Sequence, residues 1–170
     1  MKLDLGCGNT KREGAFGVDH KYFKGVNLVH DLNVYPYLIT RESYDDVLLD
    51  NSLEHINDTV KTMEEIHRIL EPGGRVVIKV PYYRSVFAID PTHKQYFNSF
   101  SFDYFDPEKD YYKYGYSDAR FRVAHVEFDT DFRWSLVKWF ANRWPVKYET
   151  RLSHLFPLRE LTFTLYKRGA

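Results

Sequence analysis

The chain has 170 residues, of which 44% are hydrophobic, and it carries 24 Lys+Arg against 24 Asp+Glu. These values fit one globular domain over residues 1–170 and exclude a disordered chain. Zero net charge disfavours a nucleic-acid partner, although residues 120–170 are basic. The sequence has neither an apolar run of the about 20 residues that span a membrane nor a signal-peptide pattern. Cys7 is the only cysteine, which favours a reducing, cytoplasmic environment. We therefore expect a cytoplasmic protein without a membrane partner; a homo-oligomer is left open.

Three short apolar runs open the chain, at residues 1–5, 15–18 and 26–29, and each is followed by a polar residue or a glycine turn. This pattern predicts parallel strands whose carboxyl ends border a ligand. About nine residues separate the first two runs, whereas a parallel crossover normally takes a dozen or more. We therefore expect the first crossover helices to shrink to single turns.

The clearest unit follows at residues 44–80. Residues 44–49 read as a buried strand, and Asn57 or Asp58 is placed to cap a helix. Apolar residues recur with helical spacing until Glu71-Pro72-Gly73-Gly74, where a glycine could supply the left-handed cap. Residues 75–80 then form the next strand. The sequence therefore predicts a strand–helix–strand unit.

The rest of the chain changes character. Residues 82–116 hold about half of all Tyr and Phe residues without a sustained period, which indicates an irregular segment over the strand ends. We expect this segment to form the acceptor side of the site. Alternation from Ala124 through Thr130 and Phe132 predicts a strand, residues 135–144 a helix, and residues 161–165 a final strand with an antiparallel partner.

Leu3-Asp4-Leu5-Gly6-Cys7-Gly8 is the stretch that points to chemistry. Glycines at a strand end allow close approach of a ligand, and backbone amides there suit polar or anionic groups. Asp4 is placed to face an ammonium group, and Asp19, at the end of the second strand, can bind both hydroxyls of a ribose. Lys11 stands where the dinucleotide fingerprint has its third glycine, which disfavours nicotinamide and flavin dinucleotides.

These motifs resemble those of class I S-adenosylmethionine-dependent methyltransferases, in particular the type-eleven methyltransferase domain. The resemblance spans about residues 1–81 and includes Asp4–Gly8, Gly17–Asp19, Asp31-Leu32, Asp45–His55 and Arg68–Ile78. It implies an α/β fold with a Rossmann-like, doubly wound, mostly parallel sheet and an antiparallel final strand, here with reduced N-terminal helices. It also implies S-adenosylmethionine as cofactor. The cofactor-binding residues that we predict are Asp4, Gly6, Cys7, Gly8, Asn9, Asp19, His20, Asp31, Leu32, Asp50, Asn51 and His55.

The sequence indicates catalytic residues less clearly than cofactor-binding ones. Methyl transfer from a sulfonium has a good leaving group, so positioning supplies much of the rate and a dedicated catalytic residue is often not needed. His93, in Asp90-Pro91-Thr92-His93, is the candidate general base; the alternative is a histidine that only holds its loop. Tyr82, Tyr83 and Tyr96 are candidate acceptor contacts, with a core role as the alternative. The histidines lack an i, i+4 pair, so we expect no metal site.

Three functions remain open. The leading one is an enzyme that transfers a methyl group to a small-molecule acceptor. The second is a catalytically silent S-adenosylmethionine-binding module or regulatory subunit, suggested by the abbreviated first crossovers. The third is a protein or RNA methyltransferase that uses the basic residues 120–170. Methyl turnover separates the first from the second, and salt-dependent RNA binding would favour the third.

Overall fold

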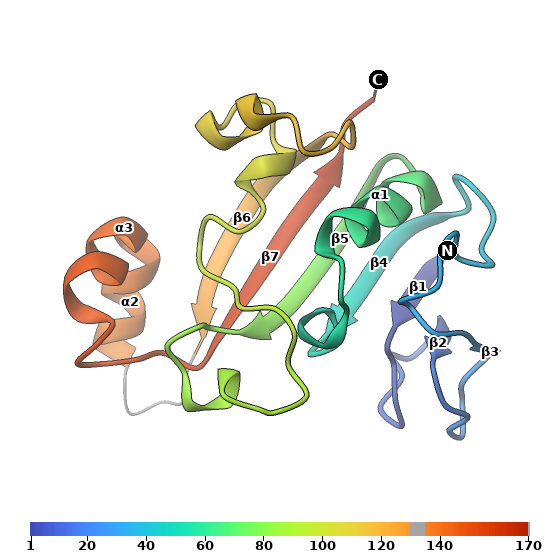
Figure 1. Cartoon of the computed structure of the whole chain (residues 1–170), viewed down its shortest axis with the longest axis horizontal. Helices are drawn as coiled ribbons and strands as arrows, with labels where there is room; N and C mark the ends of the chain where they lie inside the picture. Colours follow the sequence, from blue (N-terminus) through green and yellow to red (C-terminus); the bar gives the residue numbers. More distant parts are fainter. Residues whose placement is uncertain (130–134, 170) are drawn as a thin grey trace.

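The computed structural model describes residues 1–129 and 135–169, and a seven-stranded sheet runs through it in the order β3-β2-β1-β4-β5-β7-β6 (Figure 1). The first five strands pair in parallel, whereas β7 is antiparallel to both of its neighbours. The mostly parallel sheet with an antiparallel final strand is confirmed. The strands are β1 (Lys2–Leu5), β2 (Ala15–Asp19), β3 (Leu28–Val29), β4 (Tyr44–Asp50), β5 (Leu70–Pro81), β6 (Phe121–Asp129) and β7 (Glu160–Lys167).

The first crossovers are shorter than predicted. Among the described residues, the first helical turn is the 3-10 turn η1 (Leu53–His55), after β4. The links between β1, β2, β3 and β4 are turns, so even the single helical turns that we expected are missing there. Between β1 and β2 the chain has residues 6–14 alone, fewer than a parallel crossover with a helix normally takes, which explains the difference for this link.

The helix α1 (Thr59–Ile69) begins where the Asp58 side chain accepts a hydrogen bond from Lys61 N, as the capping pattern predicted. Its Met63 and Ile66 are buried against the sheet. The helix ends at Leu70, which has an extended backbone, so glycine does not cap it. Gly73 instead takes its positive φ of 77° in the following turn.

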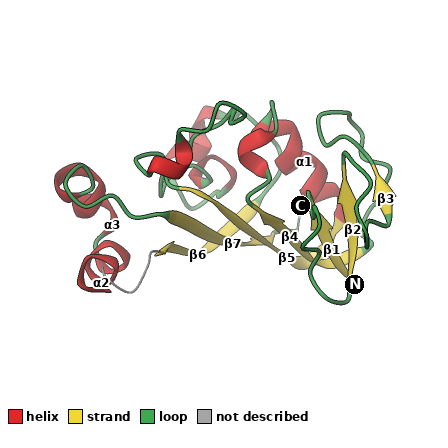
Figure 2. Cartoon of the chain, turned by 90° about the horizontal axis from the view of Figure 1, so that it is seen from below, coloured by secondary structure: helices red, strands yellow, loops and turns green. Residues whose placement is uncertain are grey.

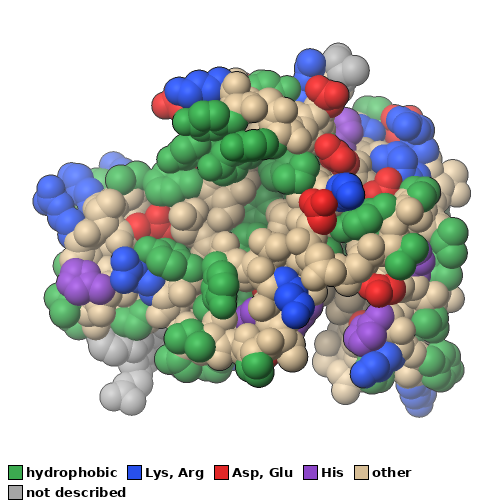
Figure 3. Space-filling model, viewed as in Figure 1, with side chains coloured by type: hydrophobic (Ala, Val, Ile, Leu, Met, Phe, Trp, Pro, Cys, Tyr) green, Lys and Arg blue, Asp and Glu red, His purple; other side chains and the backbone are tan. Residues whose placement is uncertain are grey.

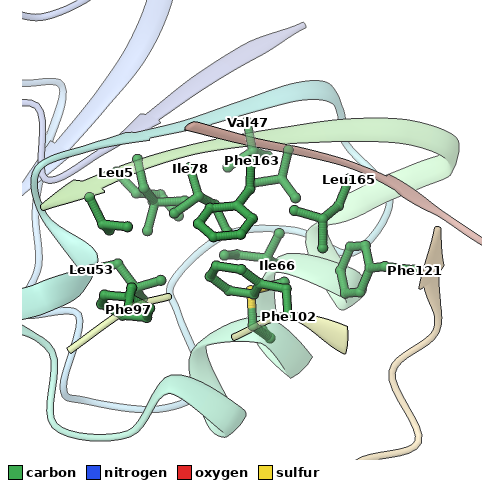
Figure 4. Packing of buried hydrophobic residues seen from close by; sticks show 14 of the residues in the cluster. Leu5, Val47, Leu53, Ile66, Ile78, Phe97, Phe102, Phe121, Phe163 and Leu165 are labelled. Atoms are coloured by element: carbon green, nitrogen blue, oxygen red, sulfur yellow. The ribbon is translucent and has the colours of Figure 1, made fainter. Parts of the chain in front are cut away.

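The hydrophobic core lies on one side of the sheet, beneath α1 and the segment 82–116 (Figure 2). Phe97 and Phe102, from that segment, stack on each other and are buried over Ile78 and Phe163 (Figure 4). The ring centroids of Phe102 and Phe163 lie 4.7 Å apart. The aromatic segment is therefore part of the core as well as of the surface.

The opposite side of the sheet carries charged residues among apolar ones. There Arg12 and Arg75 both pair with Asp46 of β4. In β6 the register shifts between Val123 and His125, so Ala124 is exposed instead of sharing the face of Phe128. Thr130 and Phe132 lie outside the described residues.

Two short helices, α2 (Ser135–Arg143) and α3 (Pro145–Lys147), lie beyond the end of β6 (Figure 1). The chain then forms one π turn at Tyr148–Leu152 before β7. In the described part of the chain, no helix has the length and apolar character needed to cross a membrane.

Candidate cofactor site

A cavity of about 570 Å³ opens at the carboxyl ends of β1, β2 and β4. Figure 3 shows the surface hollowed at this end of the sheet. The volume falls in the range of about 300–1,000 Å³ that is common for small-ligand sites. Its lining residues come from the strand ends and the turns that follow them: Gly6, Gly8, Asp19, His20, Phe23, Asp31, Leu32, Asn33, Asn51, Ser52, His55, Ile56 and Thr92.

The glycine turn is held by hydrogen bonds within the protein. The N–H groups of Gly6 and Cys7 both donate to the Val18 carbonyl, at 2.8 and 3.1 Å. Gly8 N donates to Asp19 Oδ2 at 2.9 Å. These amides are therefore satisfied already, and the turn presents its bare glycine surface to the cavity rather than the free donors that we expected.

Asp19 is 5% exposed, accepts hydrogen bonds from two backbone N–H groups and contacts the His20 ring. Besides Gly8 N on Oδ2, Lys21 N and His20 Nδ1 lie 3.1 and 3.0 Å from Oδ1. A carboxylate has about four acceptor positions, so one position on Oδ2 remains for a ligand. Accepting two hydroxyls at once requires the exposed His20 ring to leave Oδ1.

The turn after β3 forms another wall of the cavity. Asn33 donates to Asp31 Oδ1 from both its backbone N and its Nδ2, each at 2.9 Å. These two bonds lower the pKa of Asp31. Leu32 beside it is buried and supplies an apolar surface. The turn therefore places an ionised carboxylate beside an apolar patch.

Four predicted cofactor residues do not line the cavity. Asp4 is buried under the glycine turn, where it accepts a 2.7 Å hydrogen bond from Arg12 N. Cys7 points inward, and burial raises the pKa of its thiol to about 11. Asn9 and Asp50 are exposed outside the cavity. The alternation of side chains along a strand explains Asp4: it points to the side of the sheet opposite the core, away from the strand end.

Sequence reasoning missed five lining residues, namely Phe23, Asn33, Ser52, Ile56 and Thr92. Ser52 stands inside the motif Asp45–His55 that carried the resemblance, and Ile56 directly follows it, so that stretch already offered a signal. Phe23 and Thr92 lie in turns whose path the sequence does not reveal.

A second group of polar residues meets the cavity at its far edge. Glu54, of η1, is 1% exposed, and burial raises its pKa to about 7. The rings of His55 and His93 pack edge to face with centroids 4.8 Å apart. Thr92 Oγ1 lies 3.2 Å from His55 Nδ1. Within the segment 82–116, Thr92 therefore borders the cavity, whereas buried aromatic residues such as Phe97 and Phe102 cover the core.

The predicted acceptor tyrosines lie elsewhere. Tyr82 is fully buried between Phe128 and Tyr148, so a core position replaces the predicted acceptor contact. Tyr83 is 36% exposed and accepts a hydrogen bond from Arg84 Nε. Tyr96 lines a separate aromatic cavity of about 410 Å³ between α1 and the segment 82–116. Hydrophobic burial decided the position of Tyr82, because it directly follows the buried end of β5.

The family model described as methyltransferase domain matches residues 18–78, which include the cavity-lining turns from Asp19 to Ile56. This part of the chain, from β2 to β5, is therefore similar to a methyltransferase domain. The strand order of the chain and its antiparallel β7 agree with the fold of S-adenosylmethionine-dependent methyltransferases. No curated protein matches the sequence.

Solved structures share the fold at low sequence identity. A Haloferax volcanii putative methyltransferase, solved with the Trm112 methyltransferase activator, matches at TM-score 0.60 and 18% identity, over 99% of this chain and 82% of that chain. An S-adenosylmethionine-dependent methyltransferase from Archaeoglobus fulgidus matches at TM-score 0.58 and 21% sequence identity. The match covers 98% of this chain and 85% of that chain. Phosphoethanolamine N-methyltransferase 2 from Haemonchus contortus, in complex with S-adenosyl-L-methionine, matches at 0.61 and 19%. That match covers 99% of this chain but 48% of the Haemonchus chain.

Proposed function

We propose that this methyltransferase domain binds S-adenosylmethionine in the cavity at the ends of β1, β2 and β4 and transfers its methyl group to a small-molecule acceptor. The observation that carries the proposal is the arrangement of the glycine turn and the Asp19 carboxylate on one cavity of about 570 Å³. The match of residues 18–78 to the methyltransferase domain supports it.

The residues present fit this cofactor. A Cβ on Gly8 would meet nothing within 4 Å, so its surface is open to a ligand. Asp19 has a remaining acceptor position for a ribose hydroxyl, and Asp31 and Leu32 offer a carboxylate and an apolar surface beside it. Asp4, Cys7, Asn9 and Asp50 would act only indirectly, by supporting the turns.

The cofactor supplies a methyl group on a positively charged sulfur, which is already a good leaving group. The protein must therefore mainly hold the acceptor in line and exclude water. Thr92 and His55 border the cavity, which supports a role for them in contacting the bound molecules. His93 Nδ1 lies 3.2 Å from the Ala88 carbonyl, to which it donates, so Nε2 keeps a lone pair that can accept an acceptor's proton.

Isothermal titration with S-adenosylmethionine and with S-adenosylhomocysteine tests cofactor binding directly. We expect both to bind the wild-type chain, and we expect Asp19→Ala to lose about 10–100-fold in affinity with the charged hydrogen-bond acceptor. Asp118→Ala, at an exposed aspartate outside the cavity, is the control. Binding of NAD without binding of either nucleoside would overturn the proposal.

A labelled-methyl assay across cell-extract metabolites tests the acceptor. Label transfer to a small metabolite is expected. Cofactor binding with no transfer to any acceptor would instead identify a silent binding module, and transfer to RNA or protein would overturn the small-molecule assignment.

A further inference from the structure

Three side chains with metal-binding atoms meet at the edge of the cofactor cavity. Glu54 and His55 belong to η1, after β4, and His93 belongs to the turn that follows β5. A carboxylate oxygen of Glu54 and one ring nitrogen of each histidine lie within 4.8 Å of one another. Their sequence separation explains why spacing along the chain did not predict a metal site.

Backbone hydrogen bonds hold the two segments together. The Glu54 carbonyl accepts from Lys94 N at 2.7 Å and from Gln95 N at 3.2 Å. The turn itself is closed by His93 N, which donates to the Asp90 carbonyl at 3.1 Å. The cluster is therefore built on main-chain contacts rather than on the chance meeting of long side chains.

One oxygen of the buried Glu54 carboxylate lacks a hydrogen-bond partner among the described residues. Glu54 is 1% exposed, and the unpaired oxygen is its Oε2. Burial of an unpaired polar group is costly, so such groups are normally hydrogen-bonded or bound to a metal. The unpaired oxygen therefore belongs to the one carboxylate of the cluster with His55 and His93.

The histidines are oriented as metal ligands usually are. His93 Nδ1 donates to the Ala88 carbonyl at 3.2 Å, and His55 Nδ1 lies 3.2 Å from Thr92 Oγ1. Thr92 Oγ1 in turn donates to Asp90 Oδ1 at 2.6 Å. Metal-binding histidines typically use one nitrogen for such an outer hydrogen bond, which leaves the other nitrogen for the ion. Here Nε2 of both rings is left.

We propose that Glu54, His55 and His93 bind one divalent transition-metal ion at the edge of the cofactor cavity. Two imidazoles and one carboxylate suit Zn²⁺, Co²⁺, Mn²⁺ or Fe²⁺, whereas Mg²⁺ and Ca²⁺ prefer all-oxygen sites. Three protein ligands leave a coordination position open, as in catalytic zinc sites. His55 and its partner Thr92 both line the cavity, so an ion on this cluster borders the space assigned to the acceptor.

The ion also narrows the class of acceptor, and this part rests on the proposed function. A hydroxyl oxygen bound at the open position would have a lowered pKa, so that its proton passes to the solvent. His93 would then act as a ligand instead of a base. The geometry thus points to an acceptor with a hydroxyl or another metal-binding oxygen.

The metal site is tested on the full chain after removal of metals with a chelator. Titration with Co²⁺, followed by visible absorption, and with Zn²⁺, followed by calorimetry, should show one ion per chain. His93→Ala and Glu54→Gln should each lose at least about tenfold in affinity. His154→Ala, at an exposed histidine away from the cluster, should bind like the wild type. Circular dichroism checks that each variant is folded.

Stoichiometric binding that is lost in folded His93→Ala but kept in His154→Ala supports the proposal. No binding to the wild type, or equal affinity in all variants, overturns it. If Glu54→Gln does not fold, the metal affinities of the folded variants His93→Ala and His55→Ala test the proposal in its place. S-adenosylmethionine titrated with and without Zn²⁺ separates the two proposals: cofactor binding without metal binding refutes only the ion, and metal binding without cofactor binding refutes the proposed function.

Discussion

Gly6 and Ser52 touch so closely that no side chain fits between them: a Cβ on Gly6 would lie 2.4 Å from the Cβ of Ser52. Gly6 also has a φ of 74°, which residues with a side chain rarely adopt. Ser52 Oγ donates to the Leu5 carbonyl at 2.8 Å. This contact joins the end of β4 to the end of β1 and sets one wall of the cavity.

We therefore predict that Gly6→Ala destabilises the fold more than Gly8→Ala does. Both substitutions place alanine at positive φ, at a cost of about 1–2 kcal/mol, but only Gly6 also meets a neighbour. Denaturant unfolding of the two variants measures the difference in unfolding free energy. Ser52→Gly should recover part of the loss in a Gly6→Ala background. Equal destabilisation by the two alanines would show that the contact relaxes without cost.

The ion pairs of Asp46 should make the unfolding free energy depend on pH in the acid range. Burial favours its neutral form, but hydrogen bonds from Arg75 and Arg12 outweigh burial and lower its pKa. A carboxyl whose pKa is lower in the folded state stabilises above its unfolded pKa of about 3.9 and loses that contribution as pH falls through the folded pKa. Asp46→Asn should cost about 1–3 kcal/mol at pH 7.

As the pH falls below about 4, Asp46→Asn should lose less unfolding free energy than the wild type, because its amide does not titrate. Urea unfolding at several pH values measures this, with the exposed Asp118→Asn as control. Parallel stability curves for wild type and Asp46→Asn over that acid range would contradict the assigned pairing.

His93→Ala should lower methyl turnover by about 10²–10⁴-fold if proton removal limits the rate. Cofactor affinity should change little, since His93 does not line the cavity. Turnover, cofactor affinity and melting temperature are measured on the same variant. If His93 only holds its turn through the Ala88 carbonyl, the melting temperature falls instead, and turnover per folded molecule stays near normal.

Phe102→Ala tests whether the segment 82–116 belongs to one cooperative domain. The side chain is fully buried against Phe163, so its removal should cost about 3–5 kcal/mol. Tyr96→Ala, 62% exposed in the same segment, is the control and should change stability little. Thermal unfolding should remain a single transition in both variants. A separate early transition that moves only with Phe102 would show that the segment unfolds on its own.

The sequence by itself determined the features that depend on local chemistry. The apolar period of 59–69 and the capping pattern at Asn57 or Asp58 determined α1. A buried apolar run determined β4, and alternation of apolar residues determined β7. The glycine turn and Asp19 meet because parallel strands end at one edge of a sheet. Periodicity, capping and strand polarity need only neighbours along the chain, so they can be read directly.

Tertiary structure decided which polar side chains face the cavity. Asp4 lies under Arg12, and Tyr82 lies in the core, because burial and the path of the intervening turns set their surroundings. Glu54 and His93 meet only because β4 and β5 are adjacent and the turn after β5 folds back on η1. Such contacts depend on loop paths and on packing between distant segments, and neither leaves a periodic signal in the sequence.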